Sequence, residues 1–272
     1  MSDDSEELKI EMVVPENPSD ALFQDELALA ASLDRFKGAV VLKQSNNLTG
    51  AVYSLSTAAK RVLWLCLAES KSEEGHPGAF VISAKDYRRV FGGDRAKSAR
   101  DLYEGIRGAD GLARGAGVSF QIKNSRWEDV WYPWVSKVMS LQKGTQHAEY
   151  LIVFNPEIFP LMLGLQKEFT LFKLTEVGKL TANQARLYED CRRWLVKGSF
   201  TTTFEDLAER YQFSKTLRDR PAEIERSFLK AACDKINKHT PLLVEYVKDA
   251  NGGLLFHVAE KKKAIEDKEK AE

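Results

Sequence analysis

The sequence predicts an α+β fold built from two similar domains in tandem, related by an internal repeat. Three observations predict it. A chain of 272 residues is long for one compact core and fits two, because domains cluster at about 100–150 residues. Two stretches of the chain match at a spacing of 125 residues in one block and 120 in the next. Each copy alternates helical periodicity with short β-favouring runs and ends in a predicted hairpin.

The repeat consists of two pairs of aligned blocks. The first block aligns Leu55, Ser56, Arg61 and Val62 with Leu180, Thr181, Arg186 and Leu187. The second aligns Phe80, Ser83, Asp86 and Phe91 with Phe200, Thr203, Asp206 and Tyr211. Identical or similar residues at these positions predict the same order of elements in both copies.

Each copy begins with a helix whose predicted N-cap is Ser56 or Thr181, because a hydroxyl there accepts a bond from the free amides of the first turn. The β-favouring runs "AFVIS" and "SFTTT" follow and end in a residue able to cap a second, short helix. After a brief turn comes a third, longer helix. In the second copy this helix begins at Pro221, where the missing amide hydrogen costs nothing.

Predicted hairpins complete both copies: a long one from "GVSFQIKN" to "YLIVF", and a shorter one, "LLVEYVKDANGGLLFHVAEK", with a turn at "DANGG". Helix, strand, short helix, third helix and hairpin is the order of a winged helix, so the fold class is α+β with two tandem winged-helix domains related by an internal repeat. We therefore predict an acidic, disordered head at 1–36, a first winged-helix domain at 37–155, an apolar connector packed between the domains at 156–178, a second winged-helix domain at 179–260 and a charged tail at 261–272.

Charge is distributed unevenly although the formal net charge is zero. Residues 1–34 hold one Lys and ten acidic residues, whereas residues 35–263 hold 37 Lys or Arg and 26 acidic residues. A basic body is compatible with a polyanionic partner such as double-stranded DNA. The acidic start and the lack of a long apolar run predict a cytoplasmic protein. The three cysteines, Cys66, Cys191 and Cys233, lie in apolar helical patterns and are predicted to be buried thiols.

The third helix of the second copy is the predicted DNA reader, because a helix-turn-helix unit places its last helix in the major groove. Its predicted inward stripe is Ile224, Phe228, Ala231, Ala232 and Ile236. The outward residues are Arg226, then Lys230 and Ser227. Arg is able to bond guanine's two acceptors. Other basic residues complete the predicted DNA-binding set of this domain: Lys215, Arg218 and Arg220 before the helix and Lys248 on the hairpin. The alternative is that these are solvated surface charges.

The third helix of the first copy carries Arg95, Lys97 and Arg100 near its start, and Leu102, Tyr103 and Ile106 are its predicted core face. The three basic residues join the predicted DNA-binding set. The pattern does not separate base reading from backbone anchoring or from a dimer interface.

Enzymatic activity is not expected, and neither is a metal or another cofactor. The four histidines lie far apart, no cysteine pair has metal-ligand spacing, and "GGDRAKSA" lacks the Gly-Lys pair of a phosphate-binding loop. One reading of Tyr188 is a DNA-cleaving nucleophile. The pattern favours the other reading, core packing, because Tyr188 lies on the apolar stripe of a helix. The tryptophans Trp127, Trp131 and Trp134 are predicted to cover the first domain's sheet rather than stack on bases.

The segments "KQSNNLTGAVYSLSTAAKRVLWLCLAE", "LTANQARLYEDCRRWL" and "FLKAACDKINKHTPLLVEY" resemble the iteron-binding Rep_3 family of plasmid replication initiator proteins, over about residues 40–260. The resemblance implies a DNA-binding initiator without enzymatic activity that recognises direct repeats (iterons) at a plasmid origin as a monomer. A homodimer, joined largely through the first domain, would repress the initiator's own promoter at an inverted repeat. Host initiator, replicative helicase and chaperones are the implied partners.

One departure from the family concerns the reading helix: Glu225, Arg226 and Ser227 replace a basic run. Arg226 is therefore carried over first, Ser227 and Lys230 after it, and a base contact from Glu225 is not expected. The rival function is a dedicated transcriptional repressor with tandem winged helices and no initiation role. An enzyme acting on DNA is a third reading, which predicts metal-dependent cleavage.

Overall fold

The computed structural model describes most of the chain from Val40 onward, and all described residues belong to one compact unit, Asp34–Glu272. The described residues are 36, 40–70, 78–115, 117–121, 129–140, 149–163, 169–249 and 253–261. The predictions for the acidic head and the charged tail therefore fall outside the described residues, apart from Phe36 and Lys261.

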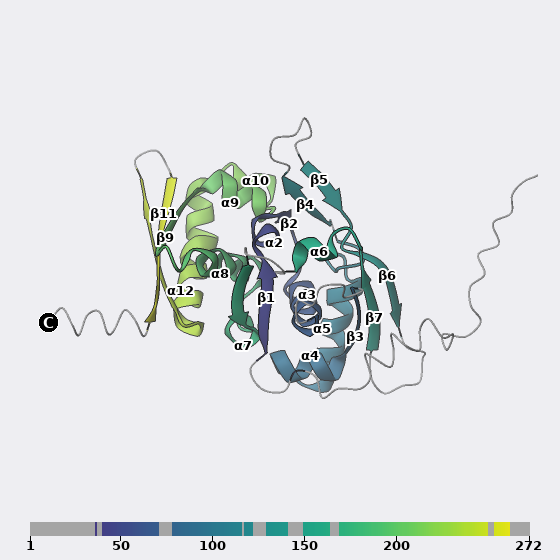
Figure 1. The fold of residues 1–272 in the computed structure, drawn as a ribbon. Helices are drawn as coiled ribbons and strands as arrows, with labels where there is room; N and C mark the ends of the chain where they lie inside the picture. The colour runs from purple at the N-terminus through teal and green to yellow at the C-terminus, as the bar shows by residue number, and fades with distance from the viewer. Residues whose placement is uncertain are drawn as a thin grey trace, which may run out of the picture. The chain divides into compact units, whose positions relative to one another are not determined.

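The first run of elements is α3 (Thr57–Glu69), β3 (Ala79–Ser83), α4 (Ala84–Phe91) and α5 (Arg95–Arg107). Ser56 caps α3 as predicted, since its Oγ accepts from the Ala59 amide at 3.1 Å. Ser83 caps α4 and forms a reciprocal capping box with Asp86. These caps fix where each helix begins, and Figure 1 shows α3, α4 and α5 packed beside β3.

The second run repeats this order: α8 (Ala182–Trp194), β9 (Ser199–Thr203), α9 (Phe204–Arg210), α10 (Lys215–Arg218) and then a long third helix. Thr181 is the N-cap of α8, and its amide donates to Gln184 Oε1 at 3.1 Å. Thr203 Oγ1 accepts from the Asp206 amide at 3.0 Å, as Ser83 does in the first run. The predicted order of elements therefore occurs twice along the chain, and the α+β class is confirmed.

The second run ends in the predicted hairpin, formed by β10 (Leu242–Lys248) and β11 (Gly253–Glu260). β11 also pairs with β9, which gives an antiparallel sheet in the order β10–β11–β9. Phe200 and Phe256 lie opposite each other in this sheet and stack with ring centroids 4.7 Å apart. The apolar face of the sheet covers the helices of the second run (Figure 1).

The first run ends in a more elaborate arrangement than the single long hairpin that the sequence predicts. The strands are β4 (Val118–Gln121), β5 (Asp129–Tyr132), β6 (Val135–Ser140) and β7 (Glu149–Phe154). They form two sheets, β2–β4–β5 with β2 (Val52–Tyr53), and β3–β7–β6. The chain leaves one sheet and enters the other at Pro133, which has no amide hydrogen to continue a ladder.

Trp134 enters the core beside this break, and its ring meets that of Tyr53 edge to face, with the ring centroids 5.3 Å apart. It is 1% exposed, in line with the predicted covering role. Trp131 is 56% exposed, and its predicted covering role stays a prediction. Trp127 lies outside the described residues.

The predicted connector contains α6 (Phe159–Met162), β8 (Phe169–Lys173) and α7 (Leu174–Val177). β8 pairs antiparallel with β1 (Val41–Ser45), which is followed by α2 (Asn46–Gly50). Phe172 of β8 contacts both runs, since its ring centroid lies 6.2 Å from that of Trp64 in α3 and 5.7 Å from that of Tyr188 in α8. This segment therefore belongs to the packed core. The exact domain boundaries stay a prediction.

Two further expectations concern the core. The predicted core face of α5 is wrong at Tyr103, which is 45% exposed, while Leu102 and Ile106 are buried. Gly105 is buried instead, because α5 approaches α3 so closely that a Cβ at this position would lie 2.7 Å from the Ala58 carbonyl oxygen. The prediction for the cysteines is confirmed: all three are buried and free. Among the described residues, no helix is long and apolar enough to cross a membrane.

Candidate nucleic-acid interface

The predicted reading helix runs from Pro221 to His239 in three segments. These are α11 (Pro221–Ile224), the π-helical turn η1 (Glu225–Leu229) and α12 (Lys230–His239). Pro221 stands at the first helical position, as predicted. A π turn inserts one residue into the α-helical register, and such turns are frequent at functional sites.

The π turn changes which residues face the core. Ile224, Ala232 and Ile236 are buried as predicted, but Ala231 is exposed, so its prediction as an inward residue is wrong. Leu229 is fully buried instead, five positions after Ile224, which is the spacing of a π turn. The sequence prediction assumed an uninterrupted α-helix, in which Phe228 and Ala231 face inward. With the π turn, Phe228 is half-buried against the core, and Leu229 takes a fully buried position.

Arg226 lies on the exposed face of the π turn, with its side chain 80% exposed. Its guanidinium is paired with Glu223, and Arg226 Nη2 lies 2.7 Å from Glu223 Oε2. Arg226 Nε donates to the same carboxylate oxygen at 3.2 Å. Ser227 is exposed as well, but its hydroxyl donates to the Glu223 carbonyl oxygen at 2.6 Å. Glu223 therefore binds both Arg226 and Ser227, two of the three outward residues that are predicted to contact DNA.

Glu225 ties the helix to the hairpin, which explains why a carboxylate stands at this position. Its Oε2 accepts from Lys248 Nζ at 2.8 Å and its Oε1 from the Tyr246 hydroxyl at 3.3 Å. The hydrogen bond from Lys248 lowers the pKa of Glu225 below its ordinary value. Burial, followed by the charge of Glu225, raises the pKa of Tyr246 to about 12. Lys248, a predicted DNA contact, is thus engaged with the reading helix.

The remaining predicted cations of this half surround the start of the helix. Lys215, Arg220 and Lys230 are exposed, and within the described part of the chain none of them pairs with an acidic side chain. Arg218 donates from Nε to the Phe213 carbonyl oxygen at 2.8 Å, which fixes its stem. An exposed surface of cations that are not neutralised by carboxylates favours contact with phosphates.

The three predicted cations of the first half lie together on the first turns of α5. Arg95, Lys97 and Arg100 are all exposed. Asp94 caps this helix by accepting from the Lys97 amide at 2.8 Å, and this bond lowers the pKa of Asp94. The carboxylate thus serves the helix terminus, and the three side chains remain at the surface.

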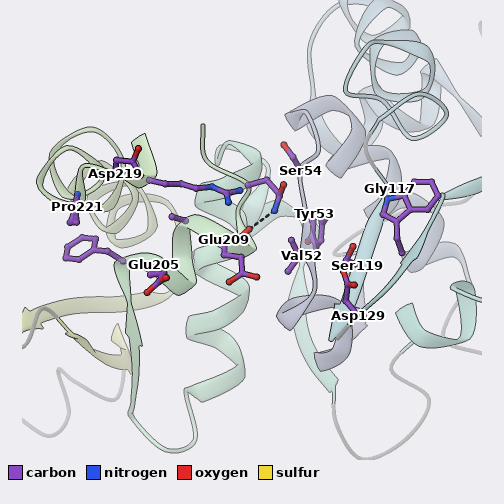
Figure 2. Close-up of a pocket in the computed structure, with 15 residues that line it drawn as sticks. Val52, Tyr53, Ser54, Gly117, Ser119, Asp129, Glu205, Glu209, Asp219 and Pro221 are labelled. Carbon is purple, nitrogen blue, oxygen red and sulfur yellow. Dashed lines mark hydrogen bonds between the residues drawn. The ribbon is translucent and has the colours of Figure 1, made fainter. Parts of the chain in front are cut away.

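A groove of about 940 Å³ separates β2, β4 and β5 from the helices α9, α10 and α11 (Figure 2). Among its described lining residues, Asp129, Glu205, Glu209 and Asp219 are acidic and Arg218 alone is basic. Carboxylates repel phosphate, so this surface is unsuited to a nucleic-acid backbone. Apart from Arg218, the predicted DNA-binding cations do not line this groove.

No cluster of metal-ligating side chains occurs among the described residues. Tyr188 is fully buried, and its hydroxyl donates to Glu176. Burial raises the pKa of Tyr188, so the phenol is held protonated inside the core. The core role predicted for this tyrosine is confirmed.

Residues 41–192, more than half of the chain, match the family described as "Initiator Replication protein, WH1". The chain belongs to this family of replication initiator proteins. The match extends from β1 into α8. It therefore includes most of the first helix of the second run.

Two known proteins are similar to this initiator. It is 33% identical over 240 residues to an "Uncharacterized 27.6 kDa protein" of Escherichia coli, covering 83% of this chain and 97% of the relative. It is also similar in fold to a Pi initiator protein whose crystal structure was solved in complex with iteron DNA. That likeness has a TM-score of 0.64 at 20% identity and covers 82% of this chain and 98% of the other.

Sequence reasoning about this initiator missed the carboxylate partners of its predicted cations. Glu223 precedes Arg226 by three residues, a spacing that brings side chains together on a helix and was a readable signal. Glu225 and Lys248 are 23 residues apart, and only the folded hairpin brings them into contact.

Proposed function

We propose that this initiator binds double-stranded DNA sequence-specifically, recognising direct repeats at a plasmid origin. The observation that carries the proposal is the likeness in fold, over 98% of its length, to the Pi initiator protein solved with iteron DNA. Membership of the replication initiator family supports it. The exposed cations on α5 and on α10 to α12 supply side chains suited to phosphates and to base edges.

In this proposal Arg226 reads a base, because a guanidinium bonds guanine's O6 and N7 together. It must exchange Glu223 for the base. Arg226 Nε and Nη2 donate to the two Glu223 oxygens at 3.2 and 3.0 Å, and a two-nitrogen fork of this kind suits the paired acceptors of guanine, which supports the proposal. Lys230, Ser227, Arg220, Arg218, Lys215 and Lys248 contact the backbone around it. Arg95, Lys97 and Arg100 of α5 anchor a second stretch of DNA.

The role is non-enzymatic: the protein recognises the origin and leaves strand chemistry to other proteins. A dimeric form represses the initiator's own promoter at an inverted repeat. A dedicated repressor would instead protect only an inverted repeat over a promoter.

A footprint on the DNA flanking the gene, made separately with monomer and dimer fractions, tests these assignments. We expect the monomer to protect tandem direct repeats. Protection of an operator alone would favour the repressor. Protection of neither would contradict specific DNA binding.

The Arg226→Ala variant tests the reading helix. Because its guanidinium is exposed and serves no core residue, we expect an unchanged circular dichroism spectrum and a loss of about 1–3 kcal/mol in repeat-specific binding. Glu157→Gln, an exposed change in the turn after β7, is the control. An unchanged footprint with Arg226→Ala would remove the second half from the role of reader.

A further inference from the structure

The two halves of the chain contact each other through residues at equivalent positions of the internal repeat. Arg61 Nη2 of α3 donates to the Gly178 carbonyl oxygen at 2.5 Å. Arg186 Nη1 of α8 donates to the Tyr53 carbonyl oxygen at 2.6 Å. Both the arginines and their acceptors are separated by the repeat spacing of 125 residues. The contact is therefore reciprocal: each half sends the same arginine to the same position of the other.

The reciprocity extends to the neighbours of the two arginines. The Arg61 guanidinium lies 5.1 Å from the Phe91 ring centroid and that of Arg186 lies 4.6 Å from the Tyr211 ring centroid. Phe91 and Tyr211 are themselves aligned in the repeat. The contact therefore has the arrangement of a local two-fold relation between the halves.

The centre of this interface is a buried ion pair. Lys60 Nζ of α3 lies 3.0 Å from Glu189 of α8, and the two side chains are 1% and 0% exposed. Lys60 Nζ lies 3.0 Å from both Glu189 oxygens, and Trp64 Nε1 donates to Glu189 Oε1 at 3.1 Å. Lys60 also donates to the Tyr53 hydroxyl at 2.5 Å. Two groups of the first half, Lys60 and Trp64, thus bind one carboxylate of the second.

Such a contact resists gradual displacement. Separating Lys60 from Glu189 would leave two uncompensated charges in a buried site, which is strongly unfavourable. Sliding one half against the other would also remove the acceptors of Arg186, which donates to the Ala51 and Tyr53 carbonyl oxygens. These contacts therefore hold the two halves in one relative orientation in this structure.

We propose that Lys60, Glu189 and Arg186 are positioning residues that set the spacing between the two stretches of DNA contacted by the halves. The proposal rests on the proposed function. A rigid connection allows both helices to engage only when the DNA segments are correctly spaced, and affinity is lost when geometry forbids simultaneous engagement. The interface thus determines which spacing between the two DNA stretches the protein binds, although it contacts no base itself.

The test compares binding to the native repeat with binding to repeats carrying one or two inserted base pairs between the two protected stretches. Each inserted pair moves the far stretch by about 3.4 Å and rotates it by roughly 35°. For the unmodified protein we expect an affinity loss of about tenfold or more per insertion, since one of the two contacts is abandoned.

The variant is Lys60→Ala with Glu189→Ala, which removes both charges, the acceptor of Trp64 and the side-chain volume that fills this part of the contact. We expect weaker binding to the native repeat and an insertion penalty reduced to about threefold or less, because a looser connection adapts to either spacing. Glu260→Gln is the matched control. Glu260 of β11 forms an ion pair at the surface, at 3.4 Å, with Arg192, which lies on α8 as Glu189 does, and the change removes the charge of Glu260. It should leave both affinity and penalty unchanged.

A folded double variant that keeps the full insertion penalty would overturn the proposal, and so would an unmodified protein indifferent to spacing. If the double variant fails to fold, Arg186→Lys gives the same reading, because it keeps the charge and loses the planar fork that reaches both carbonyl oxygens. Failure of the proposed function is separate: in that case Arg226→Ala binds the native repeat as tightly as the unmodified protein does.

Discussion

The Arg226 guanidinium lies against the Glu223 carboxylate, with Nη2 2.7 Å from Oε2, on the exposed face of the π turn. The pair is solvated, so it contributes little to stability. Its consequence is electrostatic, because a carboxylate beside the predicted reading residue opposes any phosphate that comes near it.

Glu223→Gln should therefore strengthen binding to the specific repeat more than binding to unrelated DNA. Removing the charge lowers repulsion for every sequence, and only at the specific repeat does it also release Arg226 for its base contact. We expect the ratio of the specific to the unrelated affinity to rise by about threefold to tenfold. Fluorescence anisotropy titrations at two salt concentrations measure it, and Glu157→Gln is the control. An unchanged ratio would assign Glu223 to helix geometry alone.

Replacing two adjacent alanines tests the register imposed by the π turn. Ala231 is exposed and Ala232 is fully buried. Ala231→Lys should change the free energy of unfolding by less than about 0.5 kcal/mol, while Ala232→Lys places a charge in the core and should cost more than about 3 kcal/mol. Urea denaturation of both variants measures the difference. Equal destabilisation would indicate the uninterrupted α-helix that the sequence predicts.

The hydrogen bond between Tyr246 and Glu225 should appear in the titration of the phenol. Burial and the neighbouring carboxylate raise the pKa of Tyr246 from 10 to about 12. Since the folded-state pKa is raised, the phenol contributes stability that is complete below pH 10 and is lost as pH rises through about 12.

Glu225→Gln should move the titration of Tyr246 part of the way back toward 10, because burial, the larger cause, remains. Carbon-13 resonances of labelled tyrosine, assigned with Tyr246→Phe, follow the titration. A midpoint unaffected by Glu225→Gln would show that the carboxylate does not act on this phenol.

The three cysteines should react with a thiol reagent only after unfolding. Burial raises the pKa of Cys66, Cys191 and Cys233, so the reactive thiolate is scarce and inaccessible. Absorbance of the released reagent should show negligible modification of the native protein at neutral pH and three thiols per chain in urea. Rapid reaction of one thiol in the native protein would contradict its burial.

Local features of this protein could be read from the sequence because they depend on neighbouring residues. Ser56, Ser83 and Thr203 cap helices where the repeat alignment predicts them, since a cap needs only a hydroxyl and the next three amides. The exposure of Arg226 and Lys230 followed in the same way from helical periodicity.

The sequence by itself determined the α+β class, the repeated order of elements and the cations that reach the surface. Only the tertiary structure decided that Leu229 replaces Ala231 in the core, that Glu225 binds Lys248, and that Lys60 meets Glu189. The physical reason is that helical periodicity and capping act over a few residues. A π turn, a contact from helix to hairpin and a buried ion pair 129 residues apart in sequence depend on the packing of the whole unit.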